Sequence, residues 1–183
     1  MLLLVMLSSL HIKYLFRRIL AYLIDIFLCM VFILFTQWIL LSLHFNPFEG
    51  QRVIANPALL HLWVFATVTF PIFVYFSLTE SSRYKSTIGK KWMHLQVETT
   101  RGRIMSFDRA LMRNVIKLLP WEASHFVLFY LGDMGKGASS GYLLGNIVVG
   151  VVCVGYLLCL FSSKDHKAVH DVLVKTQVVE VKK

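Results

Sequence analysis

The sequence predicts an all-α polytopic membrane protein with about four transmembrane helices, short interfacial helices and a small cytoplasmic β element. The chain is 57% apolar and only 16% charged, with a mean hydropathy of +0.65, whereas soluble domains average about 25% charged residues. Its apolar residues gather in runs of about 20, the length that a helix needs to cross a hydrocarbon core of roughly 30 Å. No linker, low-complexity tract or internal repeat divides the 183 residues, so a single membrane domain over 1–183 is expected.

Four apolar runs are the expected spans. The first and the fourth contain no Lys or Arg. The second contains Pro71, which would kink the helix and free a backbone carbonyl for neighbouring groups to satisfy. The third is interrupted by Pro120 and carries charged and histidine residues, which indicates a broken, tilted or partly interfacial helix. In chain order, the spans are Ile19–Leu43, Ala58–Leu78, Leu111–Leu131 and Tyr142–Phe161.

The opening segment, Met1–Leu10, is too short to span a membrane, and no basic segment precedes its apolar residues. Neither a transmembrane helix nor a secretory signal fits that pattern. The segment is therefore expected to be a short lead-in that lies at the membrane interface.

The basic residues predict the orientation. Of the nineteen Lys and Arg residues, only Arg52 and Lys136 fall in the loops after the first and third spans. Cytoplasmic loops carry an excess of Lys and Arg, so both termini, the middle loop 79–110 and the tail 162–183 are expected in the cytoplasm, with the chain integral to the plasma membrane. A nucleic-acid partner would require a basic soluble module. The basic residues flank spans instead, which favours anionic lipid headgroups as their partner.

The segments outside the spans carry patterns of their own. Leu95–Thr99 and Ile104–Phe107 flank a turn at Gly102 and predict a β-hairpin. Thr176–Val181 is a further strand candidate. Ser86–Met93 mixes apolar residues with two lysines, which is typical of a short helix on an anionic membrane surface.

An acidic residue inside the first span is the clearest candidate for a functional site. Asp25 would cost about 2.5–3.5 kcal/mol in lipid, so its side chain is not expected to face the hydrocarbon. Arg18 lies two helical turns earlier on the same face. Arg113 belongs to a basic stripe with Arg109 and Lys117 that either anchors headgroups or turns inward to neutralise an acid such as Asp25. The carboxylate either fixes helix orientation in an ion pair or exchanges a proton for a cation.

The ten residues from Phe16 to Asp25, FRRILAYLID, resemble the signature of the RDD family of integral membrane proteins, which is named for one arginine and two aspartates. On this match the arginine is Arg18, and the aspartates are Asp25 and Asp171. The resemblance implies a multi-span module with transport suggested and with no agreed substrate, cofactor or reaction. Further similar stretches follow in the family's order at Thr87–Lys90, Ala110–Asn114 and His170–Asp171.

The matched residues suggest one charge network. Asp171 follows the last span by about ten residues and would reach the cytoplasmic end of the first helix if 164–173 folds back as a short helix. The expected network is Arg18, Asp25, Arg113 and Asp171.

The third span also holds an acid–histidine pair that is found in only some members of the family. Glu122 and His125 share one helical face at a spacing typical of carboxylate–histidine metal sites. A simple hydrogen bond between them, or the satisfaction of backbone groups freed by Pro120, is favoured over metal ligation, and no metal is expected. His166 and His170 are a second pair, at a spacing of four.

No cofactor or enzymatic activity is expected, because the sequence contains no nucleophile elbow, phosphate-binding glycine loop or paired catalytic carboxylates. Three cysteines in apolar runs, Cys29, Cys153 and Cys159, are expected to be small hydrophobic side chains rather than ligands or disulfides. In the fourth span, small residues thin one face of the helix, which favours close packing within the chain or with a second copy. These glycines are Gly141, Gly145, Gly150 and Gly155.

Two functions remain open. The first is a transporter of a small solute or cation, in which Asp25 responds to the ion and Arg18, Arg113 and Asp171 set its charge. Four spans enclose a thin pathway, so a homo-oligomer would be needed. The alternative is a non-transporting membrane scaffold that binds a partner protein or lipid through its glycine face and basic surface.

Overall fold

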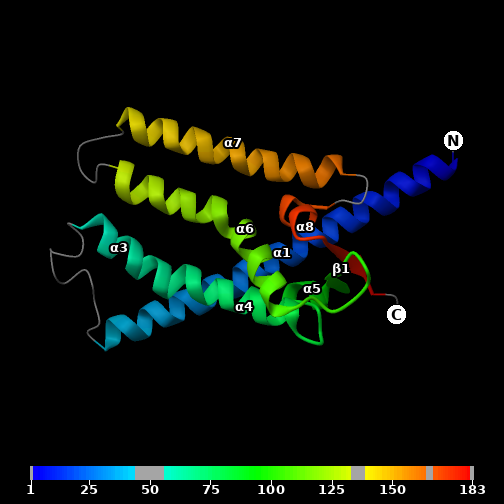
Figure 1. Ribbon diagram of the computed structural model, residues 1–183, viewed down its shortest axis with the longest axis horizontal. Coiled ribbons are helices and arrows are strands. Elements are labelled where there is room, and N and C mark those ends of the chain that lie inside the picture. Colours follow the sequence, from blue (N-terminus) through cyan, green and yellow to red (C-terminus); the bar gives the residue numbers. More distant parts are fainter. Residues whose placement is uncertain (1, 44–55, 133–138, 164–166, 182–183) are drawn as a thin grey trace.

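A computed structural model describes residues 2–43, 56–132, 139–163 and 167–181, with side chains from Ile12 onward. Most of these residues are helical, and the long helices run roughly side by side, with the N- and C-termini toward the same end (Figure 1). Three described stretches are long and apolar enough to cross a membrane: Ile12–Ser42, Pro57–Ser81 and Ser140–Ser162. Three of the four expected spans are thus found by length and composition.

The first helix, α1, is longer than expected. It runs without a break over Leu2–Ser42, which corresponds to roughly 60 Å. The residues before Ile19 thus continue the helix of the first span, and the position of Met1–Leu10 at the membrane interface stays a prediction. The 41 residues contain neither glycine nor proline, so no residue in this stretch interrupts the helical hydrogen bonds.

The second span is built from three parts, α3 (Pro57–Val64), a π-helical turn η1 (Phe65–Thr69) and α4 (Phe70–Ser81). Asn56 caps the start, since its side-chain oxygen accepts hydrogen bonds from two backbone N–H groups of the first turn. The irregularity expected around Pro71 takes the form of the wider turn η1, which immediately precedes the proline-bearing turn.

The third hydrophobic segment forms α6 (Phe107–Phe126) followed by a second π-helical turn, η2 (Val127–Leu131). Figure 1 shows that α6 changes direction along its length. Pro120 cannot donate to the carbonyl of Ile116, and the Tyr156 hydroxyl donates to that oxygen instead at 2.8 Å. The freed carbonyl predicted for a proline in a membrane helix is thus satisfied by the neighbouring helix α7 (Ser140–Ser162).

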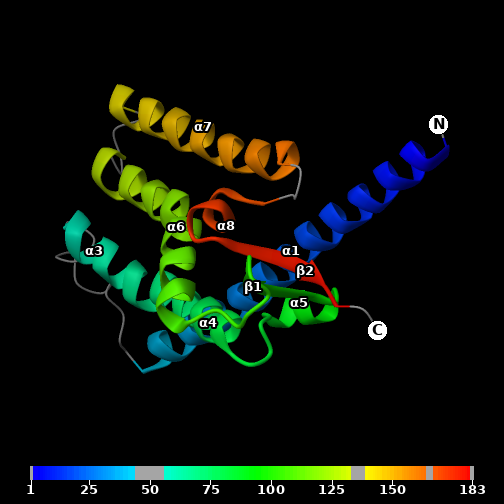
Figure 2. The same ribbon diagram turned by 45° about the vertical axis from the view of Figure 1, so that its right-hand side comes forward.

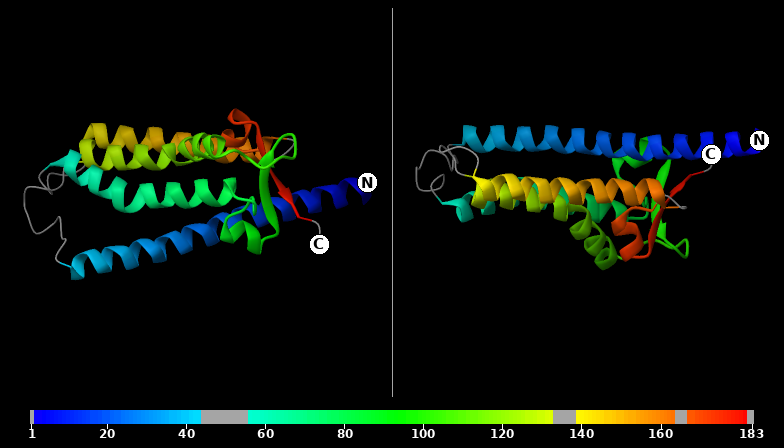
Figure 3. Two further views of the ribbon diagram at one scale, coloured as in Figure 1. Left: turned by 60° about the horizontal axis from the view of Figure 1, so that its bottom comes forward. Right: turned by 90° about the horizontal axis from the view of Figure 1, so that it is seen from above.

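Four short elements form a cap at the end of the bundle where the C-terminus lies. Figures 2 and 3 show this cap from further directions. They are α5 (Ile88–Trp92), β1 (Leu95–Thr99), α8 (Val169–Leu173) and β2 (Thr176–Glu180). The cap has a small apolar core, and α1 contributes Ala21 to it. The other members of this core are Leu95, Val97, Met105, Ala110 and Val178.

The two strands are antiparallel, with Leu95 opposite Glu180 and Thr99 opposite Thr176. The expected turn is present, because Gly102 has a φ of +73° and its N–H donates to Thr99 O at 2.8 Å. The expected hairpin partner Ile104–Phe107 is wrong. After the turn, the chain enters α6 at Phe107, and β2 supplies the alternating buried residues that complete the apolar face of β1.

Candidate functional site

Asp25 lies in a pocket where α5 meets α1. Its side chain is fully buried and accepts three hydrogen bonds. The donors are the Tyr75 hydroxyl at 2.9 Å, the Thr87 hydroxyl at 2.5 Å and the Gly89 backbone N–H at 2.9 Å. All three donors are neutral, and none of the described partners of Asp25 is an arginine. The carboxylate therefore binds α5 and α4 to α1 through hydrogen bonds alone.

Gly89 makes this contact feasible. A Cβ atom at this position would lie 2.2 Å from the carbonyl oxygen of Ala21 and 3.0 Å from Cγ of Asp25. Any larger residue would push α5 away from α1 and break the Gly89 hydrogen bond. This glycine belongs to the Thr87–Lys90 stretch, so its place in the family-like pattern has a steric reason.

Asp25 is the seventh residue of the expected span Ile19–Leu43, and the apolar stretch of the structure begins earlier, at Ile12. From Asp25 to Ser42, α1 rises roughly 26 Å, which is close to the thickness of a hydrocarbon core. Because α5 and the cap are attached at the level of Asp25, the carboxylate lies toward the cap end of the span.

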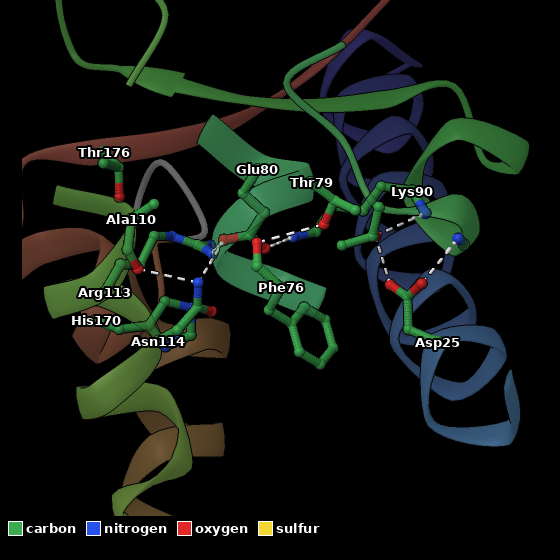
Figure 4. A network of polar contacts seen from close by, with 12 residues as sticks. Asp25, Phe76, Thr79, Glu80, Lys90, Ala110, Arg113, Asn114, His170 and Thr176 are labelled. Carbon is green, nitrogen blue, oxygen red and sulfur yellow. Dashed lines mark hydrogen bonds and ion pairs between the residues drawn. The ribbon is translucent and has the colours of Figure 1, made fainter. Parts of the chain in front are cut away.

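A second set of charges, which we call the ionic network, lies at the same end of the bundle (Figure 4). At its centre, the Arg113 guanidinium donates to Glu80 and to Asp171, reaching Asp171 Oδ1 from Nη2 at 2.8 Å. Arg18 Nη2 lies 2.8 Å from the other oxygen of Asp171, and the Lys90 ammonium pairs with Glu80. The network joins five elements, and its members are Arg18, Glu80, Lys90, Arg113 and Asp171.

The surroundings of Asp171 stabilise its charge. Its carboxylate also accepts the N–H of Ala168 at 3.2 Å and the hydroxyl of Thr176 at 3.2 Å. Burial by itself would raise the pKa of Asp171, but the charges of Arg113 and Arg18 hold that pKa well below its usual range. Burial and the charge of Arg113 together lower the pKa of His170 well below its ordinary value. The cap therefore contains an ionised aspartate beside a neutral histidine.

The structure brings together three of the four residues in the expected network. Asp171 folds back to Arg18 through α8, and Arg113 turns inward. The expected pairing of either arginine with Asp25 is wrong. Side chains on a helix lean toward its N-terminus, so Arg18 reaches toward α8 and away from Asp25, which lies about 10 Å further along the axis.

Sequence reasoning missed Glu80 and Lys90. Glu80 lies two residues beyond the expected end of the second span, and Lys90 was assigned to the membrane surface. The two side chains pair with each other, and Glu80 also pairs with Arg113. The family-like Thr87–Lys90 stretch could have marked Lys90 as a site residue. No pattern in the sequence around Glu80 indicated that its side chain is buried.

A second polar site, the Glu122 cluster, lies between α3, η1 and α6. Glu122 Oε2 is 3.2 Å from Nε2 of His61, and Oε1 is 3.1 Å from Nδ1 of His125. The Thr69 hydroxyl donates to Oε1. The acid–histidine contact predicted from the i, i+3 spacing is present. His61 and Thr69 were missed, because their approach depends on how α3 and η1 pack against α6.

Among the described residues, no group of three or more His, Cys, Asp and Glu side chains is arranged to hold a metal ion. His166 lies outside the described residues, so the expected pair with His170 is not placed. The three cysteines Cys29, Cys153 and Cys159 are free thiols.

The four glycines of α7 do not share one role. A Cβ atom at Gly145 would lie 2.8 Å from a methyl group of Val127, so this glycine packs closely on η2. Gly141 approaches only its neighbour Ser139, and nothing described lies within 4 Å of such an atom at Gly150 or Gly155. Among the residues that the structure describes, close packing is therefore limited to one of these four glycines.

Apolar helices of membrane-spanning length, joined at one end by buried ion pairs and a small cap, define an integral membrane protein of the helical, polytopic class. The model of the RDD family matches residues 13–175. The chain therefore belongs to the RDD family. No curated protein and no solved structure matches it.

Proposed function

We propose that this protein transports a small solute or cation along the interface between α6 and the α3–η1–α4 segment. The observation that supports this proposal is a polar seam that follows the interface for most of its length. Ionisable residues inside a membrane protein are costly and mark substrate and ion pathways. A purely structural helix pair would be more stable with apolar side chains at these positions.

The seam changes character along its length. At the cap end Arg113 pairs with Glu80, and in the middle the Lys117 ammonium lies 3.2 Å from the centre of the Phe76 ring with no hydrogen bond to a described residue. Further along, Glu122 contacts residues of α3 and η1. On α6 the seam comprises Arg113, Asn114, Lys117, Glu122 and His125, which face Glu80, Ser77, Phe76, Thr69 and His61.

Asp25 has a different role in this proposal from the one expected from sequence. Its acceptors are filled by Tyr75, Thr87 and Gly89, which supports an anchoring role for α5. We assign the ion-responsive role to the seam, where Lys117 has no hydrogen bond to a described residue and Glu122 is partly exposed.

The transport proposal is tested with the purified protein in liposomes, by measuring proton flux that depends on added cations. Lys117→Met removes the charge in the middle of the seam, and Arg109→Met makes the same change at an exposed position of the same helix. We expect flux above that of empty liposomes for the wild type, a loss of at least tenfold for Lys117→Met, and wild-type flux for Arg109→Met. Folded wild-type protein without flux, or equal flux in both variants, would contradict the proposal.

The proposed orientation places four spans in the plasma membrane with both termini in the cytoplasm, supported by the asymmetry of the Lys and Arg residues. Single cysteines are introduced at Lys136, Arg101 or Lys182 after Cys29, Cys153 and Cys159 are replaced by alanine. An impermeant maleimide should label position 136 from outside, and positions 101 and 182 only from inside. Labelling of position 101 from outside would overturn the four-span arrangement.

A lipid-binding module is the second candidate, favoured by an exposed corner near α5. Arg83 and Lys91 both lie over the Tyr84 ring, at 5.1 and 5.2 Å, and Trp92 is 62% exposed beside Ile88. Cations next to exposed aromatic and apolar side chains suit an anionic membrane surface. Stabilisation of the detergent-solubilised protein by anionic phospholipid, lost in the double variant Arg83→Gln and Lys91→Gln, would support this role.

A further inference from the structure

The Glu122 cluster lies away from the ionic network and differs from it in chemistry. Glu122 follows Arg113 by nine residues on α6, which corresponds to roughly 13 Å along the helix. Its partners are His61 and His125, whose rings can gain or lose a proton, and Thr69, whose hydroxyl can reorient its hydrogen. The guanidinium groups of the network stay charged at all accessible pH values.

The hydrogen bonds leave two proton acceptors open. With one proton on each imidazole, His61 donates from Nε2 and His125 donates from Nδ1 to the Glu122 carboxylate. Nδ1 of His61 and Nε2 of His125 then have lone pairs and no hydrogen-bond partner among the described residues. The three side chains are 21%, 14% and 24% exposed, for His61, His125 and Glu122 respectively, so the protein does not enclose them completely.

The charge of the cluster favours the uptake of one proton. Two neutral histidines and one carboxylate carry a net charge of −1. No other charged side chain of the described residues forms an ion pair with Glu122. A proton on either ring converts this charge into an imidazolium–carboxylate pair with no net charge, which costs less to bury than a lone carboxylate.

The groups that face the cluster support a protonated ring. Thr69 of η1 contributes a neutral hydroxyl. Trp121 lies 5.2 Å from the His125 ring, and Phe129 and Tyr130 of η2 lie 5.6 and 5.7 Å from the His61 ring. Aromatic rings at such distances attract a cation and bring no competing charge.

Both helices change their winding at the cluster. The turn η1 begins four residues after His61 and ends at Thr69, and η2 begins two residues after His125. Single π-helical turns inside α-helices occur frequently at functional sites, because the wider turn redirects side chains and leaves the helix locally adjustable. The two π-helical turns are therefore a second observation, separate from the chemistry of the side chains, that supports a functional site here.

We propose that His61, Glu122 and His125 form a proton-binding site that takes up one proton on an imidazole ring nitrogen. A hydronium ion in adjoining water transfers its proton to that nitrogen and becomes water, and Glu122 remains a carboxylate paired with the new imidazolium. The inference rests on the proposed function for its purpose, since the proton would be the ion coupled to transport. Proton binding itself is measurable without transport.

The experiment uses the full-length protein with ¹⁵N-labelled histidine in lipid nanodiscs, and the ring nitrogen resonances are followed between about pH 4 and 9. Resonances of the cluster are assigned from their loss in His61→Gln and His125→Gln. In Glu122→Gln, we expect their titration midpoint to move toward acid by at least one pH unit, a tenfold loss of proton affinity. His94→Gln, at an exposed position outside the cluster, should leave the cluster resonances unchanged.

Several outcomes would overturn the proposal. Cluster histidines that stay neutral over the whole range, or titrate identically in wild type and Glu122→Gln, would show that no shared proton site exists. An unchanged His170 resonance in Glu122→Gln verifies that the cap is folded. If the cluster titrates as expected while liposomes show no flux, only the transport proposal fails. If flux is present and the cluster does not titrate, only the proton site fails.

Discussion

The ionic network and the Glu122 cluster are both polar sites on α6, but the network is buried and the cluster is partly exposed, and different groups pair with their carboxylates. In the network, carboxylates are paired with arginine and lysine, and the paired side chains are 0–12% exposed. In the cluster, a carboxylate is paired with histidines, and the side chains are 14–24% exposed. A network of permanently charged partners suits a fixed helix arrangement, whereas histidines with open ring nitrogens suit proton exchange.

Because they differ in burial and in pairing, the two sites should respond differently to substitution. Removal of one partner from a fully buried ion pair leaves the other charge unpaired, which costs roughly 3–5 kcal/mol. A partly exposed cluster can recruit water or change its protonation instead. We therefore expect stability to depend on the network and activity to depend on the cluster.

The largest effect is expected for Arg113→Met, which leaves the buried carboxylates Glu80 and Asp171 without their shared partner. The free energy of unfolding in mixed micelles should fall by about 3–5 kcal/mol. Arg109→Met, on the exposed side of the same helix, should change it by less than about 0.5 kcal/mol. A loss for Glu122→Gln as large as that for Arg113→Met would break the distinction between the two sites.

A smaller loss is expected for Asp25→Asn. The amide retains one acceptor oxygen and places an NH₂ group against one of the three donors, so the free energy of unfolding should fall by about 1–3 kcal/mol. Because Arg18 contacts Asp171, which is not among the described partners of Asp25, Arg18→Gln and Asp25→Asn should be additive within about 0.5 kcal/mol. Recovery of stability in the double variant would show that the two residues pair after all.

Asp25→Asn also tests how transport is divided between the two regions. We expect the flux per folded molecule to stay near the wild-type value with an unchanged pH profile, because Asp25 serves as an anchor. Normal folding combined with lost flux would return the ion-responsive role to Asp25.

The glycines of α7 provide a comparable test of packing. Gly145→Ala places a methyl group against Val127 and should reduce the free energy of unfolding by about 1–3 kcal/mol. Gly150→Ala meets open space in the chain and should be neutral or slightly stabilising, because alanine favours helix. If Gly150→Ala instead reduces oligomer content in detergent, the open face of α7 packs on a second copy.

A gradual effect on stability is expected from pH. The pKa of buried His170 lies well below its ordinary value, so below about pH 6.5 the unfolded chain binds a proton that the folded chain does not. Stability should therefore fall with falling pH, by at most about 1.4 kcal/mol per pH unit for this group. Asp171, with its lowered pKa, adds a loss only below its unfolded pKa of about 3.9. His170→Asn should flatten the decline between about pH 6.5 and 5, and an unchanged decline would exclude His170 as its source.

Local patterns in the sequence were sufficient for the membrane class, for the apolar helices, for both strand segments and for the irregularities near Pro71 and Pro120. The length of an apolar run, a residue that favours a turn and the N–H group that proline lacks each affect only a few neighbouring residues. The sequence alone can therefore predict their effects. The family-like pattern likewise identified Arg18, Asp25 and Asp171 as important positions.

Only the tertiary structure decided which groups meet. Asp25 bonds to Thr87, 62 positions away, and Arg18 bonds to Asp171, 153 positions away. Strand β1 pairs with a distant strand rather than with the next extended segment. Such partners depend on how α5, α8 and β2 fold back on the long helices, and sequence spacing does not encode that geometry. The sequence by itself therefore determined a helical membrane protein with charges in its apolar segments. The packing of the cap determined which carboxylates form ion pairs, and the packing of α3 and η1 on α6 placed Glu122 beside two histidines.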